Sequence, residues 1–399
     1  MSASRNRSGR RLLGLSWAHL LNDGAANYLP GVLPAVLVAL HLPVSTAGAL
    51  IAALTMGQAL QPVTGWLADR LGGRSLVVGG LLLSSLGGAL LGFAGSTWLL
   101  VLLLLLIGVG NACFHPQALA GVRTIVEGRQ GLVTSAFLVG GELGRGLWPT
   151  VASLVVSGPG LRWLWLVGLP GLLTVPVLWR VAPNLEPRPR TGQRIRWARH
   201  TRPMVVLVGY QCVRAFTIYV LVTFIPILWH LGGGSLVQGA SIISTMVTVG
   251  VVGNLWGGHL TDRFGRLPML VTSGVASAVL IVPVILLGGV WVWVFAAVLG
   301  VALFLTASTT ILIGQDTFPE NRSMGSGIAL GLANGVGAFL VLLVGLWVGN
   351  DNITVVFWAV AALTLASALL ALALPVSLRG HTHPSGRAAA TQADDSAAD

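Results

Sequence analysis

Long apolar runs recur along the whole chain of 399 residues, and they limit the folds that it can adopt. Hydrophobic residues make up 54% of the chain and charged residues only 9%, whereas a soluble domain carries about 25% charged residues. An apolar run of about 18 or more residues can cross the hydrocarbon core of a membrane as a helix. The sequence therefore predicts an all-α polytopic membrane protein with twelve transmembrane helices, at about 12–40, 44–68, 76–94, 98–122, 132–157, 161–182, 204–231, 236–260, 268–288, 290–315, 324–349 and 354–377.

One polar motif occurs twice, each time between two apolar runs. The copies read GWLADRLGGR (65–74) and GHLTDRFGR (258–266), and they lie about half the chain length apart. A repeated turn at this spacing indicates two related six-helix halves, an organisation typical of secondary transporters. We expect an N-terminal bundle at 1–182, a basic linker at 183–203, a C-terminal bundle at 204–377 and a disordered tail at 378–399.

The net charge of +11 comes from arginine alone, since the chain has no lysine. Most of these arginines fall in alternate loops or at the termini, which is the bias that orients membrane proteins with their basic loops in the cytoplasm. We therefore expect a multi-pass protein of the plasma membrane with both termini cytoplasmic, and no binding of nucleic acid. The first apolar run reads as a mature span rather than a cleaved signal peptide.

A cluster of polar residues interrupts the first predicted span. Asp23 lies one helical turn after His19, so that both share a face, and Asn22 and Asn27 add further polar groups. An ionisable group within a membrane costs several kcal/mol unless it is paired or neutralised. Asp23 is either a proton carrier or a structural hydrogen-bonding centre, and the prolines at 30–34 predict a helix break just beyond it.

Three more charged residues fall within spans. Glu142 and Arg145 are three residues apart on the fifth span and can pair, either to neutralise each other or to exchange partners with a proton or substrate. Arg214 has no local acidic neighbour, so it must pair with Glu142 or Asp23 from the other half, or meet an anionic substrate. His115 is either a structural hydrogen-bonding residue or a proton relay, and it lacks companions at metal-ligand spacing.

These segments together resemble one family. The duplicated turn is similar to the signature loop of the major facilitator superfamily, whose members have two six-helix halves. Within that superfamily, further segments resemble the fosmidomycin-resistance type of drug exporters: HLLND (19–23), GNACFHP (110–116), GGELG (140–144), VRAF (213–216) and TFIP (223–226). The chain departs from that pattern at Glu142 and Arg145, where the family more usually has uncharged residues, and at Leu267, where a basic residue is expected.

The resemblance implies alternating access. Asp69 is expected to engage Arg70, Arg74 and the N-terminus of the eleventh span near Met324, which would latch the cytoplasmic side shut. Taken together with the charged residues within the spans, it leads us to expect three groups of site residues: proton coupling at Asp23 and Glu142; substrate binding at His19, Asn22, Asn27, His115, Arg145 and Arg214; and a conformational latch at Gly65, Asp69, Arg70, Arg74, Gly258, Asp262, Arg263 and Arg266.

We therefore expect a secondary transporter that exports small drug-like or anionic molecules in exchange for protons, and that works as a monomer in the lipid bilayer. No ATP-binding motif is present, so the energy must come from a gradient. We expect no cofactor, no metal and no enzymatic activity. A metabolite importer or uniporter of the same fold is one alternative, and a membrane sensor or assembly partner that transports nothing is another.

Overall fold

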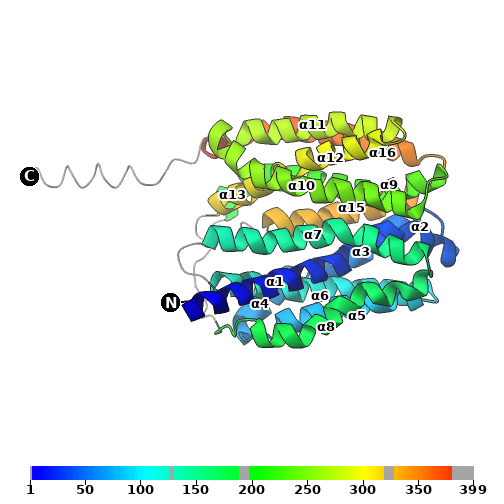
Figure 1. Cartoon of the computed structure of the whole chain (residues 1–399). Coiled ribbons are helices and arrows are strands. Elements are labelled where there is room, and N and C mark those ends of the chain that lie inside the picture. The colour runs from blue at the N-terminus through cyan, green and yellow to red at the C-terminus, as the bar shows by residue number, and fades with distance from the viewer. Residues whose placement is uncertain (1, 126–129, 188–196, 319–327, 380–399) are drawn as a thin grey trace, which may run out of the picture.

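The computed structural model describes residues 2–125, 130–187, 197–318 and 328–379, and this part of the chain is almost entirely helical (Figure 1). The first half comprises α1 (Ser2–Asn27), α2 (Leu29–Ala39), α3 (Thr46–Gln58), α4 (Gln61–Leu71), α5 (Ser75–Leu90), α6 (Thr97–Arg123), α7 (Gln130–Ser157) and α8 (Trp165–Val181). The second half comprises α9 (Trp197–Leu231), α10 (Leu236–Phe264), α11 (Arg266–Leu286), α12 (Trp291–Phe304), α13 (Ala307–Thr317), α15 (Ala333–Trp347), α16 (Ile353–Ala371) and the short α17 (Val376–Arg379).

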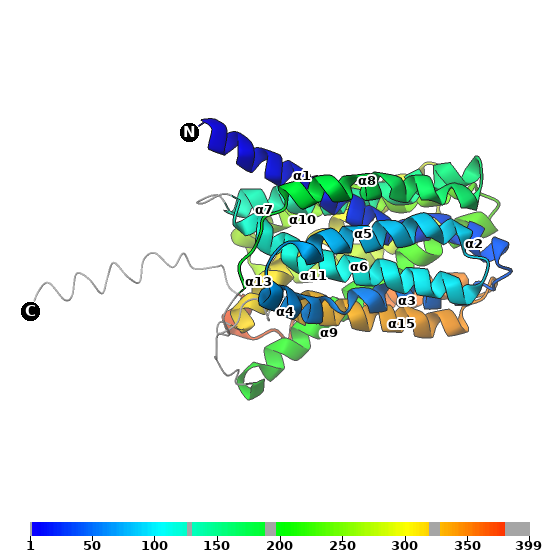
Figure 2. The same cartoon turned by 90° about the horizontal axis from the view of Figure 1, so that it is seen from below.

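The predicted fold class is confirmed. Eight of the described helical segments are long and apolar enough to cross a membrane. The first and second predicted spans are each built from two consecutive helices, α1 with α2 and α3 with α4, and the eleventh contains α15. The helices lie side by side along one direction in both views, as expected of a membrane bundle (Figures 1 and 2).

The predicted break in the first span lies between α1 and α2. Tyr28 separates the two helices, and Pro30 occupies the first turn of α2, where its missing N–H costs nothing. The Nδ2 atom of Asn27 donates to the carbonyl oxygen of Asp23, at 2.8 Å. The hydroxyl of Tyr28 donates to the carbonyl oxygen of Gly88 on α5, at 2.7 Å. Hydrogen bonds of the residues at the end of α1 and just after it therefore stabilise the break, which lies just beyond the polar cluster.

Glycines close the helix at both copies of the duplicated motif. Gly72 follows α4 with a φ of 59°, and Gly265 follows α10 with a φ of 88°. Both values lie in the left-handed region, where a side chain would be strained. The repeat therefore preserves a sharp helix-ending turn.

The two halves meet at the end of the bundle away from Ser2, which we call the distal end. There α7 packs against α10 and α3 against α15. A Cβ on Gly345 would lie 2.9 Å from the Cα of Gly48, so the absence of side chains permits this approach. Thr150 on α7 also donates a hydrogen bond to the hydroxyl of Ser244 on α10, at 2.7 Å.

The second half begins earlier than its apolar run. Helix α9 already starts at Trp197, inside the predicted linker of 183–203, because arginine favours helix even where it is too polar for the hydrocarbon core. Residues 188–196 of that linker and residues 380–399 of the predicted tail lie outside the described residues. The hydropathy pattern predicted the apolar part of α9, at 204–231, but not the polar first turns of that helix.

Candidate functional site

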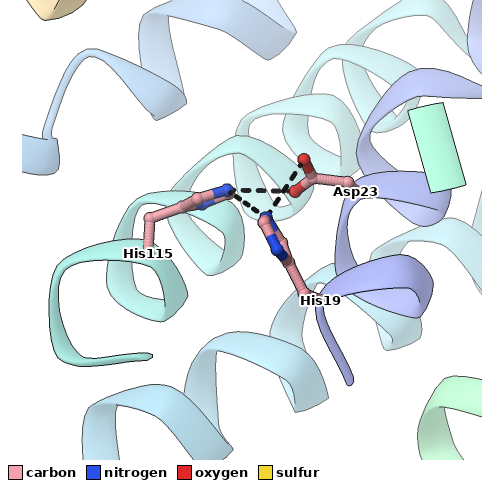
Figure 3. A group of neighbouring side chains, drawn as sticks. All are labelled: His19, Asp23 and His115. Carbon is pink, nitrogen blue, oxygen red and sulfur yellow. Dashed lines mark hydrogen bonds and ion pairs between the residues drawn. The ribbon is translucent and has the colours of Figure 1, made fainter. Parts of the chain in front are cut away.

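A buried carboxylate lies at the centre of the candidate site. Asp23 on α1 is only 1% exposed. The Nε2 atom of His115, on α6, lies 3.1 Å from its Oδ1 atom, and the Nε2 atom of His19 lies 3.5 Å from its Oδ2 atom. Figure 3 shows the two imidazole rings converging on the carboxylate from different helices. The expected shared face of His19 and Asp23 is confirmed, and His115 joins them.

Amide donors hold the same carboxylate. The Nδ2 atoms of Asn22 and Asn111 donate to the Oδ1 atom of Asp23, at 3.2 and 3.1 Å. The hydroxyl of Ser84 on α5 donates to the Oδ1 atom of Asn22, at 2.8 Å, which fixes the orientation of that amide. Helices α1 and α6 therefore contribute amide donors to one anion, and this compensates for its removal from water.

Two charged residues on α7 complete the cluster in the first half. The Arg145 guanidinium lies 3.1 Å from the Oδ2 atom of Asp23 and 3.6 Å from the Oε2 atom of Glu142. The expected pair of Glu142 and Arg145 is therefore present, and Arg145 bridges it to Asp23. Arg145 is 38% exposed and His115 is 25% exposed, so the cluster can be reached from one side.

A glycine-rich face of α7 permits this geometry. A Cβ on Gly141 would collide with the imidazole of His19, and one on Gly144 would collide with the carbonyl oxygen of Leu20. Small residues let helix backbones approach closely where the surrounding lipid is as apolar as the side chains. The glycines therefore place the polar face of α1 directly against the charged residues of α7.

The second half contributes Arg214 and Tyr219 from α9. Arg214 lies near enough to Glu142 and Arg145 for their charges to interact, and Tyr219 lies similarly near Arg145. The Nε atom of Arg214 donates to the carbonyl oxygen of Leu303, at 2.7 Å. Among the ion pairs of the described residues, none joins Arg214 to Asp23 or Glu142. A guanidinium of the second half therefore lies near the charged cluster, while it contacts Leu303 and the ring of Phe304 in its own half.

Three side chains of the cluster have the donor atoms of a metal site. The ligand atoms of His19, Asp23 and His115 all lie within 4.8 Å of one another. The Arg145 guanidinium, however, forms an ion pair with the same carboxylate, and its positive charge opposes a divalent cation. The arrangement is better suited to holding a proton, which adds a single charge.

The sequence reasoning missed part of this site. His115 has no companions at metal-ligand spacing in the sequence, but His19 and Asp23, which are far from it in sequence, lie close to it in space. Asn111 and Ser84 were not singled out either. Asn111 lies one helical turn before His115 on α6, and that spacing was the available signal.

The residues expected to form the latch lie at the end of the bundle where α1 begins. Gly65 on α4 faces α6, the guanidinium of Arg70 is exposed, and Arg74 donates to the carbonyl oxygen of Trp179 on α8, at 2.7 Å. The Asp69 side chain and the start of the eleventh span lie outside the described residues. The contact expected between them stays a prediction.

The second copy of the motif forms an ion pair within its own half. Arg266 is buried and lies 2.6 Å from the Oδ2 atom of Asp316 on α13. Gly258 faces α13 as well, whereas Asp262 and Arg263 are exposed. This copy therefore ties α11 to α13.

A sequence model of the Major Facilitator Superfamily matches residues 15–342 and, again, residues 211–395. The chain is 27% identical to the Fosmidomycin resistance protein of Escherichia coli (strain K12) over 389 residues, covering 94% of this chain and 95% of that protein. It is 26% identical to the Uncharacterized MFS-type transporter YfnC of Bacillus subtilis (strain 168), covering 91% of this chain and 92% of that protein.

A solved structure has the same fold. The crystal structure of a mutant of the nucleoside transporter NupG superposes with a TM-score of 0.77, covering 91% of this chain and 99% of that chain. The identity is 13%, so this likeness concerns the arrangement of the helices alone.

Proposed function

The chain belongs to the major facilitator superfamily, and on that premise we propose that it exports small drug-like or anionic molecules in exchange for protons. The main support for this proposal is the buried Asp23, which forms close polar contacts with two imidazoles and a guanidinium. The site lies next to the second half of the molecule. Ionisable groups inside a membrane bundle mark substrate paths and proton relays. The 27% identity to a fosmidomycin resistance protein supports export of a drug-like molecule.

The charges favour a substrate with an anionic group. Arg145 from the first half and Arg214 from the second face the same region, and Arg145 is partly exposed. A guanidinium binds carboxylate and phosphate groups with two parallel hydrogen bonds. A substrate held between Arg145 and Arg214 would touch both halves, as alternating access requires.

Competition for acceptor atoms explains why exchange is favoured over joint transport. The acceptors of the cluster are the oxygen atoms of Asp23 and the ring nitrogens of His115 and His19. An N–H or O–H group of the substrate can donate a hydrogen bond only to an acceptor whose lone pair is free. A proton that binds to the same lone pair blocks that hydrogen bond. Binding of one therefore weakens binding of the other, which is a coupling between ligands at one site.

His19, Asn22 and Asn27 have supporting roles in this scheme. His19 and Asn22 are buried against Asp23, and Asn27 bonds to the backbone of Asp23. Glu142 holds Arg145 in place when no substrate is bound. These residues position Asp23, which stabilises the positive charge of the bound proton, and Arg145, which binds the substrate.

The membrane orientation and the larger organisation complete the proposal. The termini and the segment 183–203 that links the halves lie on the cytoplasmic side, following the positions of the arginines. Asp69, with Arg70 and Arg74, closes that side when the distal end opens. One chain carries the whole path, so the monomer is the working unit.

Drug susceptibility and vesicle transport test the proposal together. Cells that express the chain should tolerate more fosmidomycin than cells without it. Everted vesicles from these cells should lose an imposed pH gradient when the drug is added. Asp23→Asn should abolish both effects while the amount of protein in the membrane is unchanged. Asp351→Asn, which changes an exposed carboxylate in the same way, is the matched control.

Two results would contradict the proposal. Full pH-driven transport by Asp23→Asn would remove Asp23 from proton coupling. Counterflow of substrate that does not depend on the pH gradient would instead show a uniporter or an importer with the same fold.

A further inference from the structure

Both imidazole rings of the Asp23 cluster are held in one tautomer. The Nδ1 atom of His19 lies 2.8 Å from the carbonyl oxygen of Phe137, and the Nδ1 atom of His115 lies 2.9 Å from that of Asn111. A carbonyl oxygen can only accept a hydrogen bond, so each Nδ1 atom must carry the hydrogen. A neutral ring of this tautomer has a bare lone pair on its Nε2 atom.

The two Nε2 atoms point toward each other and toward the carboxylate (Figure 3). They lie 3.2 Å apart, and they are 3.1 Å (His115) and 3.5 Å (His19) from the oxygen atoms of Asp23. With both rings neutral, three acceptors would face one another with no hydrogen between them. His19 and Asp23 are 3% and 1% exposed, so this arrangement would be costly to bury.

We propose that His19 and His115 share one proton between their Nε2 atoms, with Asp23 as the counterion, and that this is the proton of the exchange proposed above. One added hydrogen on either Nε2 atom can bridge to the other ring, and on His115 it can also bridge to Asp23. Two added hydrogens would place two cations with their N–H groups facing each other at 3.2 Å. The geometry therefore accommodates one added hydrogen for the two rings together. This identification rests on the proposed function, whereas the protonation state does not.

The proton resides on the imidazoles because three donors already stabilise the ionised form of the carboxylate. The Oδ1 atom of Asp23 accepts from Asn22 and Asn111, and its Oδ2 atom accepts from Arg145. Hydrogen bonds to a charged carboxylate favour that form over the protonated one. Asp23 thus stays ionised and stabilises a positive charge on the rings beside it.

The charged groups around the two histidines balance one another, so that one added proton gives the site a single net positive charge. Helix α7 supplies Glu142 and Arg145, and α9 of the other half supplies Arg214 near both. Asp23 and Glu142 balance Arg145 and Arg214, which leaves the proton as the net charge of the site. A divalent metal ion would double that charge beside the same two guanidinium groups. The partly exposed His115 is the ring through which the proton exchanges with water.

Nitrogen NMR of the histidine side chains tests this inference. Full-length protein labelled with ¹⁵N-histidine is placed in lipid nanodiscs after treatment with a chelator, and the His19 and His115 signals are assigned with His19→Asn and His115→Gln. The exposed His41 and His230 serve as internal references. At neutral pH, we expect three N–H hydrogens on the two rings together, both Nδ1 atoms protonated, and the third hydrogen lost when either ring is replaced.

Two neutral rings, or two fully protonated rings, would overturn the inference. So would one bound zinc ion per chain whose removal by the chelator changes the two rings and whose return restores them. These outcomes are independent of transport. A shared proton without pH-driven transport would defeat only the proposed function, and pH-driven transport with two neutral rings would defeat only the shared proton.

Discussion

Arg145 is the residue with the most conflicting demands in the site. It lies 3.1 Å from one carboxylate and 3.6 Å from another, and it is also the partly exposed cation that a substrate would meet. Without Arg145, Glu142 would be a mostly buried charge that has lost the ion pair it forms in the structure. Removing one partner of a buried ion pair costs far more than removing both.

Arg145→Gln should therefore destabilise the protein by about 2 kcal/mol, less than for a fully buried pair because Arg145 is partly exposed. The double variant Glu142→Gln with Arg145→Gln should recover part of that loss. Unfolding of the purified variants in mixed micelles measures both effects. Equal stability of the single and double variants would show that Glu142 does not depend on Arg145.

At this scale the sequence predicted contacts within one helix, such as that of Glu142 with Arg145, and missed the contact of His115 with His19 and Asp23. Asp23, Glu142 and Arg145 stood out because a charge within an apolar run is costly. The joining of His115 to His19 depends on how α6 packs against α1, and no local pattern contains that distance. Asn111 and Ser84 were missed for the same reason, since a lone polar residue in a span is compatible with many roles.

At the scale of helices, small residues decide where the two halves approach. Gly48 on α3 and Gly345 on α15 bring these helices together at the distal end. The sequence does not indicate which helices these glycines bring together, because one small residue can fit many neighbouring helices.

Gly48→Leu should force α3 and α15 apart and favour the state that is open at the distal end. Gly79→Leu is the matched control, because a Cβ at Gly79 on α5 meets nothing within 4 Å. Spin labels placed across the distal end would measure the separation. A distance distribution that is the same in Gly48→Leu, Gly79→Leu and the unmodified protein would contradict this role for the glycines.

At the scale of the whole molecule, the duplicated motif and the apolar runs were enough to predict two six-helix halves. They were not enough to predict which end of the bundle is closed, because both conformations of such a protein share one sequence. The structure has the halves in contact at the distal end, through α3 with α15 and α7 with α10. Transport requires that these contacts break once in every cycle.

A reversible disulfide across the distal end tests this requirement most directly. In a background without Cys113 and Cys212, Thr150→Cys with Ser244→Cys would join α7 to α10, where the two hydroxyls are 2.7 Å apart. Thr217→Cys with Thr364→Cys, whose hydroxyls are 2.8 Å apart within the second half, is the matched control. Oxidation should stop transport in the first variant, reductant should restore it, and the control should transport throughout. Undiminished transport by the fully oxidised first variant would contradict alternating access through the opening of these halves.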